Sequence, residues 1–367
     1  MVVGAPIYDL RVSDPSSLSR RYVARLVASL SLITLTCVAF LLPVPYVTFR
    51  PGPVFDTLGE FEGKPMFTFG EGVKTYPTTG NLDFTTVSVT SASGKMSLFR
   101  AVQAYFTDDT SVVPRSIVYP EGTTADSSKA ESAAQLDSSK EASEVAALRA
   151  AGYTVPGLPQ VASLTEGGAA EGVLEVGDLI TSVDGTAVDS SAEAVELVGQ
   201  HAPGDEVDLT IRRGDDTQDV KLTTKPDPQD ASVPRIGVGL GTKYDYPIQV
   251  DNNVGSTIGG PSAGTMFALA IYDKLTPGGL AGDLNIAGTG EITAEGVVGP
   301  IGGVQQKIAG AWRAGAQVFL VPAANCAEAV DGDTHGLKLV EVKTLDGAID
   351  AVGKLAKDRT AEVPTCR

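Results

Sequence analysis

The uncharged segment from Leu26 to Phe49 constrains this chain more than any other feature. Residues 26–42 are apolar with Ser and Thr interspersed, and with residues 43–47 the run is long enough to cross a hydrocarbon core of about 30 Å. Tyr22 and Tyr46 lie near its two ends, where amphipathic rings prefer the membrane interface. We therefore expect a transmembrane anchor over residues 22–49.

Two other interpretations of this segment are a buried core helix and a cleaved signal peptide. A core helix should show an amphipathic stripe, and none is visible. A signal peptide needs a short apolar region and a small-x-small cleavage site, whereas Pro43-Val44-Pro45-Tyr46 follows here. An uncleaved anchor fits best.

The flanking charges predict the orientation of the anchor. Four arginines precede or begin the span, namely Arg11, Arg20, Arg21 and Arg25, whereas only Arg50 follows closely. The positive-inside rule then places residues 1–21 in the cytoplasm and everything from about residue 50 outside the cell membrane.

Composition excludes several classes of function. The 367 residues leave room for two or three domains, and a net charge of −17 argues against nucleic-acid binding. With only His201 and His335, we expect no metal site. No GxxxxGK[ST] sequence occurs, so we expect neither ATP binding nor any other cofactor.

The three cysteines fall on different sides of the predicted anchor. Cys37 lies within it, whereas Cys326 and Cys366 lie outside the cell, where oxidising conditions favour a disulfide. A Cys326–Cys366 bridge is therefore plausible, and two unpaired thiols are the alternative.

Residues 154–226 have the pattern of a compact β-rich unit. A strand at 160–164, an Asp184-Gly185 hairpin turn and a helix at 191–199 follow one another, and residues 174–185 resemble a PDZ domain. The resemblance implies that an extended peptide adds as a strand beside 160–164, against helix 191–199. A structural spacer is the alternative.

The residues that would capture such a peptide are less evident. The Gly-Leu-Gly-Phe-type loop of PDZ domains is absent, and its best local counterpart is Val155-Pro156-Gly157-Leu158. We therefore expect Gly157, Leu158 and Val161 to bind the peptide. Residues 226–234 then form a proline-marked linker.

Ser262 lies on a glycine-rich turn, Gly259-Gly260-Pro261-Ser262-Ala263-Gly264, followed by an apolar helix. Such a serine can be a nucleophile, because the free amides of a helix start can stabilise an oxyanion. It can equally be a helix N-cap, or the turn can cradle a phosphate.

Further blocks after this turn distinguish these possibilities. The blocks are Ala287–Thr293, Val298–Lys307, Ala311–Ala316 and Phe319–Asn325. In this order they resemble the proteolytic domain of Lon-type serine proteases, the S16 peptidases. With the anchor and the PDZ-like unit, the chain resembles the membrane-anchored PDZ–Lon-like proteases of Gram-positive bacteria.

This resemblance implies an α+β multi-domain chain. We expect a PDZ-like β-rich domain at 154–226 and an α/β Lon-type proteolytic domain at 232–367. Residues 50–153 contain a strand at 82–90, a helix near 98–106 and a polar helix or arm at 121–143, and we expect them to belong to the protease scaffold.

The resemblance also implies the catalytic residues. Ser262 and Lys307 match the family's Ser-Lys dyad, and Thr289 is expected to hydrogen-bond near the lysine. Backbone amides of Gly259, Gly260 and Ala263 would hold the oxyanion. Lysine is a base only when neutral, and the apolar neighbours Ile301, Val304, Ile308 and Ala309 can lower its pKa by burial.

Lon enzymes carry an ATPase, which this sequence lacks. We therefore expect an ATP-independent endopeptidase of exported or membrane proteins, with the PDZ unit as substrate selector and a hexameric ring by resemblance. A non-catalytic PDZ adaptor is the alternative from another class, and a phosphate-binding module is the third.

Overall fold

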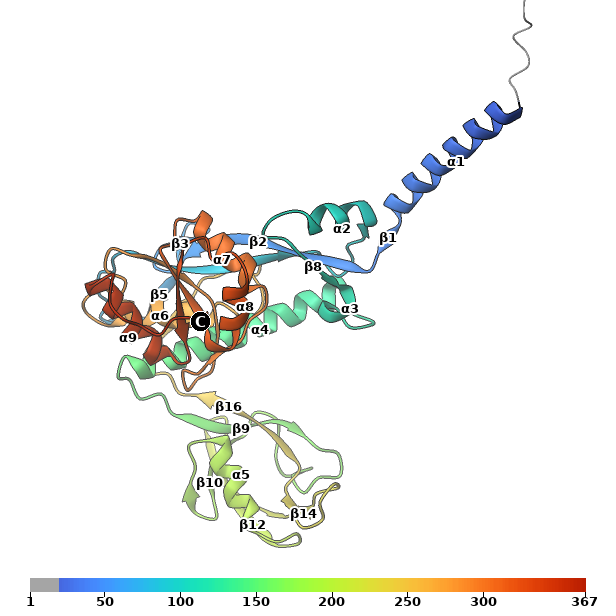
Figure 1. The fold of residues 1–367 in the computed structure, drawn as a ribbon. Helices are drawn as coiled ribbons and strands as arrows, with labels where there is room; N and C mark the ends of the chain where they lie inside the picture. The colour runs from blue at the N-terminus through green and yellow to red at the C-terminus, as the bar shows by residue number, and fades with distance from the viewer. Residues whose placement is uncertain (1–19) are drawn as a thin grey trace, which may run out of the picture. The chain divides into compact units, whose positions relative to one another are not determined.

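A computed structural model describes residues 20–367 of the chain. The predicted cytoplasmic segment, residues 1–21, therefore lies almost wholly outside the described residues. The described chain forms two compact units, of which unit 1 comprises residues 20–50 and 88–128. Unit 2 comprises residues 51–87 and 129–367 (Figure 1).

Helix α1 (Arg20–Leu41) begins unit 1 and has no buried residue. Its 22 residues span about 33 Å, which is long enough to cross a membrane. The helix is shorter than the expected anchor of 22–49, because Pro43 and Pro45 cannot continue it. Strands β1 (Pro43–Val44) and β2 (Tyr46–Asp56) follow instead, and Val47 is buried.

The rest of unit 1 is a small strand–helix assembly. It contains β7 (Met96–Ser97), α2 (Leu98–Tyr105), β8 (Ser111–Pro114) and α3 (Arg115–Val118). Strand β1 pairs with β7, and the first part of β2 pairs with β8, so that Val47 lies opposite Val113. The Ser97 side chain caps α2 by accepting from the Arg100 amide.

The part of unit 2 outside residues 154–244 contains the expected protease domain, and we call it the protease half; it is built on a parallel sheet. Its strands lie in the order β22 (Lys338–Val342), β21 (Val318–Pro322), β18 (Asn285–Gly288) and β6 (Asn81–Val89), followed by β2. All five residues of β21 are buried, as expected of a strand covered on both faces. Residues 51–56 and 81–87 thus share the sheet with the C-terminal half of the chain.

Helices cover both faces of this sheet. Helices α4 (Ala125–Ala150), α6 (Gly264–Leu275) and α9 (Leu345–Lys357) share one core, in which Phe84 and Phe267 meet edge to face. Helices α7 (Val304–Arg313) and α8 (Cys326–Asp331) pack on the other face. Residues 121–143, expected to form a polar helix or arm, belong largely to the single helix α4.

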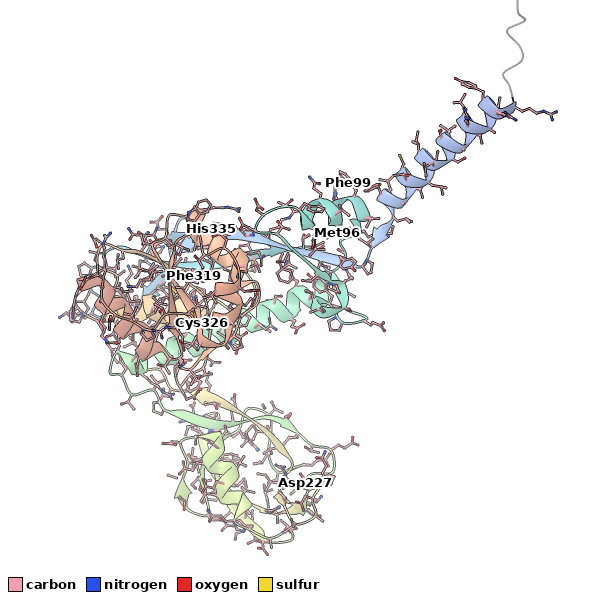
Figure 2. The ribbon with its side chains drawn as sticks, in the orientation of Figure 1. Met96, Phe99, Asp227, Phe319, Cys326 and His335 are labelled. Atoms are coloured by element: carbon pink, nitrogen blue, oxygen red, sulfur yellow. A yellow bond between two sulfur atoms is a disulfide. The ribbon has the colours of Figure 1, made fainter. Side chains whose placement is uncertain are left out.

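Short elements complete this half, and they lie in the loops that connect the main strands and helices. They are β3 (Glu60–Phe61), β4 (Lys64–Pro65), β5 (Phe67–Phe69), β17 (Val250–Asn252), β19 (Glu291–Ile292), β20 (Val298–Gly299) and the 3₁₀ turn η1 (Ala323–Asn325). A disulfide joins Cys326 to Cys366, and the Cys366 amide donates to Leu339 O of β22 (Figure 2). The chain end is thereby held against the sheet.

Residues 154–244 of unit 2 contain the expected PDZ-like domain, and we call them the PDZ half; they have their own sheet and core. Its elements are β9 (Gly157–Leu164), β10 (Leu179–Val183), β11 (Thr186–Ala187), α5 (Ser191–Gly199), β12 (Glu206–Arg213), β13 (Asp216–Thr223), β14 (Lys225–Pro226), β15 (Pro234–Arg235) and β16 (Val238–Tyr244). The strand order is β13-β12-β10-β9-β16. Strand β16 therefore belongs to this sheet, although the sequence placed it in the protease domain at 232–367.

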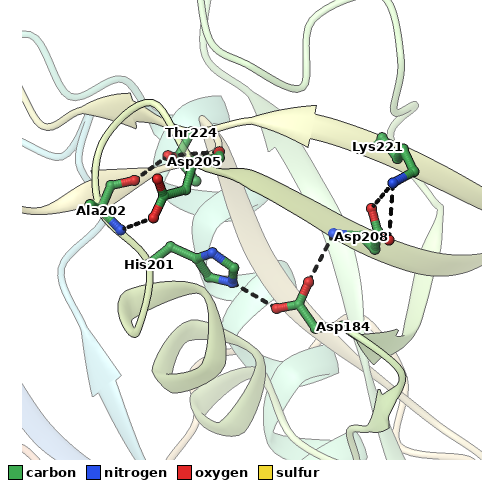
Figure 3. Close-up of polar contacts among 7 residues, drawn as sticks. All are labelled: Asp184, His201, Ala202, Asp205, Asp208, Lys221 and Thr224. Atoms are coloured by element: carbon green, nitrogen blue, oxygen red, sulfur yellow. Dashed lines mark hydrogen bonds and ion pairs between the residues drawn. The ribbon is translucent and has the colours of Figure 1, made fainter.

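The turn between β10 and β11 is fixed by a polar network. Asp184 adopts a positive φ of 50°, and its carboxylate accepts from the Asp208 amide at 3.0 Å. His201 Nε2 lies 2.7 Å from the same carboxylate (Figure 3). His201 thus stabilises the PDZ half, while His335 stacks on Trp312 at 4.6 Å in the protease half.

Candidate active site

Ser262 lies in the loop that joins β17 to α6 and is half-buried. The N-cap residue of α6 is Ala263, and no side chain caps this helix end. The Thr265 amide donates instead to Gly290 O at 3.0 Å. The Ser262 hydroxyl is therefore not used as a helix cap, which removes the simplest structural interpretation of this serine.

The backbone of Ser262 is held from the end of β18. Its carbonyl oxygen accepts from the Gly290 amide at 2.8 Å and from Thr289 Oγ1 at 2.9 Å. Thr289 is fully buried, so this second bond is shielded from water. Two donors on one carbonyl fix the direction in which the Ser262 side chain leaves the loop.

Lys307 comes to the same threonine from α7. Its side chain is 1% exposed, and Nζ donates to Thr289 Oγ1 at 2.9 Å. Burial lowers the pKa of the Lys307 amine from 10.5 to about 7, against the opposing effect of the Glu291 carboxylate. At neutral and alkaline pH, a substantial fraction of Lys307 is the neutral amine that can accept a proton.

The apolar surroundings of Lys307 explain this pKa. Val304 and Ile308 are fully buried in one apolar cluster, against which Ile301 packs, and Ala309 is fully buried as well. These are the neighbours that the sequence indicated. Residues 289–307 thus bring the Lys307 amine and Thr289 to the Ser262 backbone, in a chain of two hydrogen bonds.

Helix α4 contacts the Ser262 loop, which we did not expect from the sequence. The Gly260 amide donates to Ser132 O at 2.9 Å, and Ser139 Oγ donates to Pro261 O at 2.9 Å. A Cβ on residue 259 would lie 2.9 Å from Ser132 Cβ, so the close approach of α4 to this loop requires glycine at position 259. The only available signal was the run of Ser and Ala in α4, whose small side chains permit such close approach.

This contact changes the expected set of oxyanion donors. The Gly260 amide is already bonded to Ser132 O, and Gly260 has a φ of +85° that glycine adopts most easily. Within residues 20–367, neither the Gly259 nor the Ala263 amide donates to another protein group. The structure therefore leaves Gly259 and Ala263 as the candidate donors and removes Gly260.

The expected peptide-binding residues of the PDZ half do not lie on a free edge. Strand β9 pairs along its whole length with β16, from Gly157 opposite Tyr244 to Leu164 opposite Val238. Its other edge is bonded to the chain at residues 177–179. Val161 is fully buried. A peptide cannot add beside β9, so the expectation for Gly157, Leu158 and Val161 is wrong.

A pocket of about 300 Å³ lies instead between α5 and the β15–β16 segment. Its apolar lining includes Ile180, Val183, Ala194, Val195, Val198, Leu209, Ile236, Val238 and Leu240. Strand β16 is the last strand of the sheet, so its outer edge is available for pairing. Sequence reasoning missed this segment because it follows the linker.

Within residues 20–367, no cluster of three or more His, Cys, Asp or Glu side chains is placed to hold a metal ion. Ser262, Thr289 and Lys307 lie at the centre of the candidate site.

The comparisons with known proteins match both halves of unit 2. Residues 151–224 match the PDZ domain family, and residues 244–354 match the Lon protease (S16) C-terminal proteolytic domain. A solved PDZ domain of an SdrC-like protein from Listeria monocytogenes is 31% identical and covers 22% of this chain and 85% of that chain, with a TM-score of 0.21.

Two curated relatives are Lon proteases. Lon protease 2 of Bacillus subtilis is 35% identical over 29% of this chain, and Lon protease 1 of Thermus thermophilus is 36% identical over 33%. The matched segments span only 19% and 15% of these relatives. The chain therefore contains a PDZ domain, at residues 151–224, and a Lon-type (S16) serine protease domain, at residues 244–354.

Proposed function

We propose that this protein is a membrane-tethered serine endopeptidase that cleaves polypeptides with Ser262 as nucleophile and Lys307 as general base. The observation that carries the proposal is the buried Lys307 amine, which is bonded through Thr289 Oγ1 to the Ser262 carbonyl. Lys307 is 1% exposed, and within residues 20–367 no carboxylate is bonded to its amine. Burying such a lysine costs free energy, and proteins do so where the lysine serves as a base with a pKa near neutral.

The proposed reaction has two steps. Neutral Lys307 takes the proton of Ser262 Oγ as this oxygen attacks the peptide carbonyl, and the amides of Gly259 and Ala263 stabilise the oxyanion. The lysine ammonium then gives its proton to the leaving amine. In the second step the neutral amine deprotonates a water, which attacks the acyl-enzyme carbonyl. The Lys307 ammonium then returns this proton to Ser262 Oγ as the ester bond breaks, which releases the new carboxyl end of the product and restores the free serine.

The PDZ domain is proposed to select substrates at the pocket between α5 and β16. An extended peptide would pair with the outer edge of β16 and place an apolar side chain against Val195 and Val198. Capture there raises the local concentration of a substrate segment near the protease domain. The printed sequence has no nucleotide-binding loop, so we propose that cleavage needs no ATP and acts on flexible segments.

Helix α1 is proposed to be the anchor, with the protease domain outside the cytoplasm. Two observations support this topology. Arginines cluster at the N-terminal end of α1, and the Cys326–Cys366 disulfide is typical of an oxidising compartment. The substrates would then be exported or membrane proteins. By resemblance we also propose a homo-oligomer, with a hexameric ring as the expected form.

The test compares the full chain in lipid vesicles with its Ser262→Ala variant. Each is incubated without ATP with membrane and secreted proteins, and new N-termini are identified by mass spectrometry. The proposal predicts cleavages that only the wild type makes. If the two samples give the same N-termini while both bind peptides at the α5–β16 pocket, the adaptor function is correct instead.

A further inference from the structure

Helix α2 of unit 1 and its C-cap residue Phe106 carry apolar side chains on the face that points away from their own unit. Ala101 and Ala104 are buried beneath the helix, whereas Phe99, Val102 and Phe106 are 55%, 41% and 79% exposed. Three and four residues separate these three, so they lie on one face, opposite the two alanines. A helix in water places its apolar face inward, and here a large apolar face remains uncovered.

This face continues the surface of α1. The Leu98 amide donates to Leu42 O at 3.0 Å, which fixes the start of α2 at the end of α1. The Phe99 ring packs edge to face on Phe40 of α1, with 5.9 Å between centroids. Figures 1 and 2 show α2 beside the C-terminal end of α1, with Phe99 on its outer side.

We propose that α2 lies in the interfacial layer of the bilayer, with Phe99, Val102 and Phe106 buried among lipid headgroups and upper acyl chains. The proposal rests on the proposed anchoring by α1. A span of about 33 Å brings the end of α1 to the edge of the hydrocarbon core, and the hydrogen bond and ring contact hold α2 at that level. Aromatic side chains and Leu favour this layer.

The charges of unit 1 agree with a lipid surface as the partner. The chain as a whole carries −17, which anionic lipids repel. Residues 42–50 and 88–128, by contrast, contain four basic and four acidic side chains. Arg100 is exposed on the flank of α2, where it can meet lipid phosphates. Because residues 42–50 and 88–128 carry no net charge, anionic lipids do not repel them as they repel the acidic remainder of the chain.

The test is lipid quenching of single-tryptophan variants of the full chain in vesicles. Trp312 is the only tryptophan, so a Trp312→Phe background is free of indole. Phe106→Trp reports on the apolar face, Arg100→Trp on the flank of the same helix, and Phe40→Trp on α1. Each is measured in vesicles of phosphatidylcholine and phosphatidylglycerol, with and without bromine on the upper acyl carbons.

The proposal predicts that brominated lipid quenches Phe106→Trp several-fold more than Arg100→Trp, and to an extent similar to Phe40→Trp. Quenched Phe40→Trp with unquenched Phe106→Trp would overturn the interfacial position of α2 while leaving the anchor intact. A blue-shifted but unquenched Phe106→Trp would show that protein, such as a second copy of the chain, covers the face. Failure of Phe40→Trp to be quenched would overturn both the anchor and this inference.

Discussion

Lys307 Nζ and Ser262 O both bond to the hydroxyl of Thr289, the first as donor and the second as acceptor, at 2.9 Å each. The threonine therefore connects the proposed base to the backbone of the proposed nucleophile. Because a hydroxyl has one proton and two lone pairs, accepting from Lys307 leaves its proton for Ser262 O. The arrangement orients a lone-pair-bearing amine without a histidine or a carboxylate.

Replacing Thr289 with valine should lower kcat by about 10- to 100-fold while changing KM little, because the amine and the Ser262 carbonyl lose their shared partner. Thr289→Ser keeps the hydroxyl and should restore most of the activity. Steady-state cleavage of a fluorogenic peptide measures both. Wild-type kcat in Thr289→Val, with a loss only in Thr289→Ser, would show that the methyl group, and not the hydroxyl, matters.

Replacing Lys307 with methionine should lower kcat by about 10²- to 10⁴-fold and raise the stability of the fold. The folded-state pKa of about 7 lies below the unfolded value of 10.5, so the unfolded state binds more protons between these pH values. The wild type therefore gains stability as pH rises from 7 to 10.5, and the penalty of burying Lys307 is largest below pH 7.

Denaturant unfolding at several pH values measures this effect. The Lys307→Met variant should exceed the wild type by about 3 kcal/mol at pH 8, and the difference should shrink as pH approaches 10.5. A variant that is less stable than the wild type at every pH would contradict the buried neutral amine.

The α4 contact predicts that Ser139 positions the nucleophile loop. Ser139→Ala removes the bond to Pro261 O and should lower kcat several-fold, with a loss of about 1 kcal/mol in stability. Ser138→Ala is the matched control, since Ser138 is exposed on the same helix. If both variants keep wild-type kcat, α4 is only a packing element.

The PDZ pocket predicts where peptide capture can be disrupted. Val195→Glu places a carboxylate at the pocket of α5 and should weaken peptide binding by at least tenfold, while cleavage of a short fluorogenic peptide continues. Ala162→Glu introduces the same charge at an exposed side-chain position of β9 and should change peptide binding little. Fluorescence anisotropy of a labelled peptide distinguishes the two, and a stronger effect of Ala162→Glu would restore the β9 site.

The expected site residues lie in short sequence blocks, because glycine, proline and serine in fixed order determine both the turn before α6 and the end of β18. Lys307 and Thr289 belong to such blocks, and the structure brings them together. The contact between α4 and Gly260 was not predictable, since it is a backbone hydrogen bond between segments more than 120 residues apart. Because the bond joins the Gly260 amide to the Ser132 carbonyl, the side-chain types of the two residues do not indicate it.

Strand order and helix ends were harder to predict for related reasons. Strand β16 joins the PDZ sheet after a proline-rich linker. The alternation of apolar and polar residues within a strand does not indicate which neighbouring strand it pairs with. The peptide site was expected beside β9 because we did not foresee that β16 occupies this edge. The expected anchor of residues 22–49 runs past the end of α1 at Leu41, because hydropathy counts Val44 and Val47 as membrane residues, whereas Pro43 and Pro45 cannot continue the helix.

The most direct test of the Ser262–Lys307 pair is the pH dependence of acylation by a fluorophosphonate, measured as the rate of labelling at Ser262. The account predicts a rate that rises about tenfold per pH unit below pH 7 and then levels, because only the neutral Lys307 amine accepts the proton. The Lys307→Met variant should label at least a hundredfold more slowly. A wild-type rate that does not change between pH 5 and 9, or unchanged labelling of Lys307→Met, would contradict Lys307 as the base.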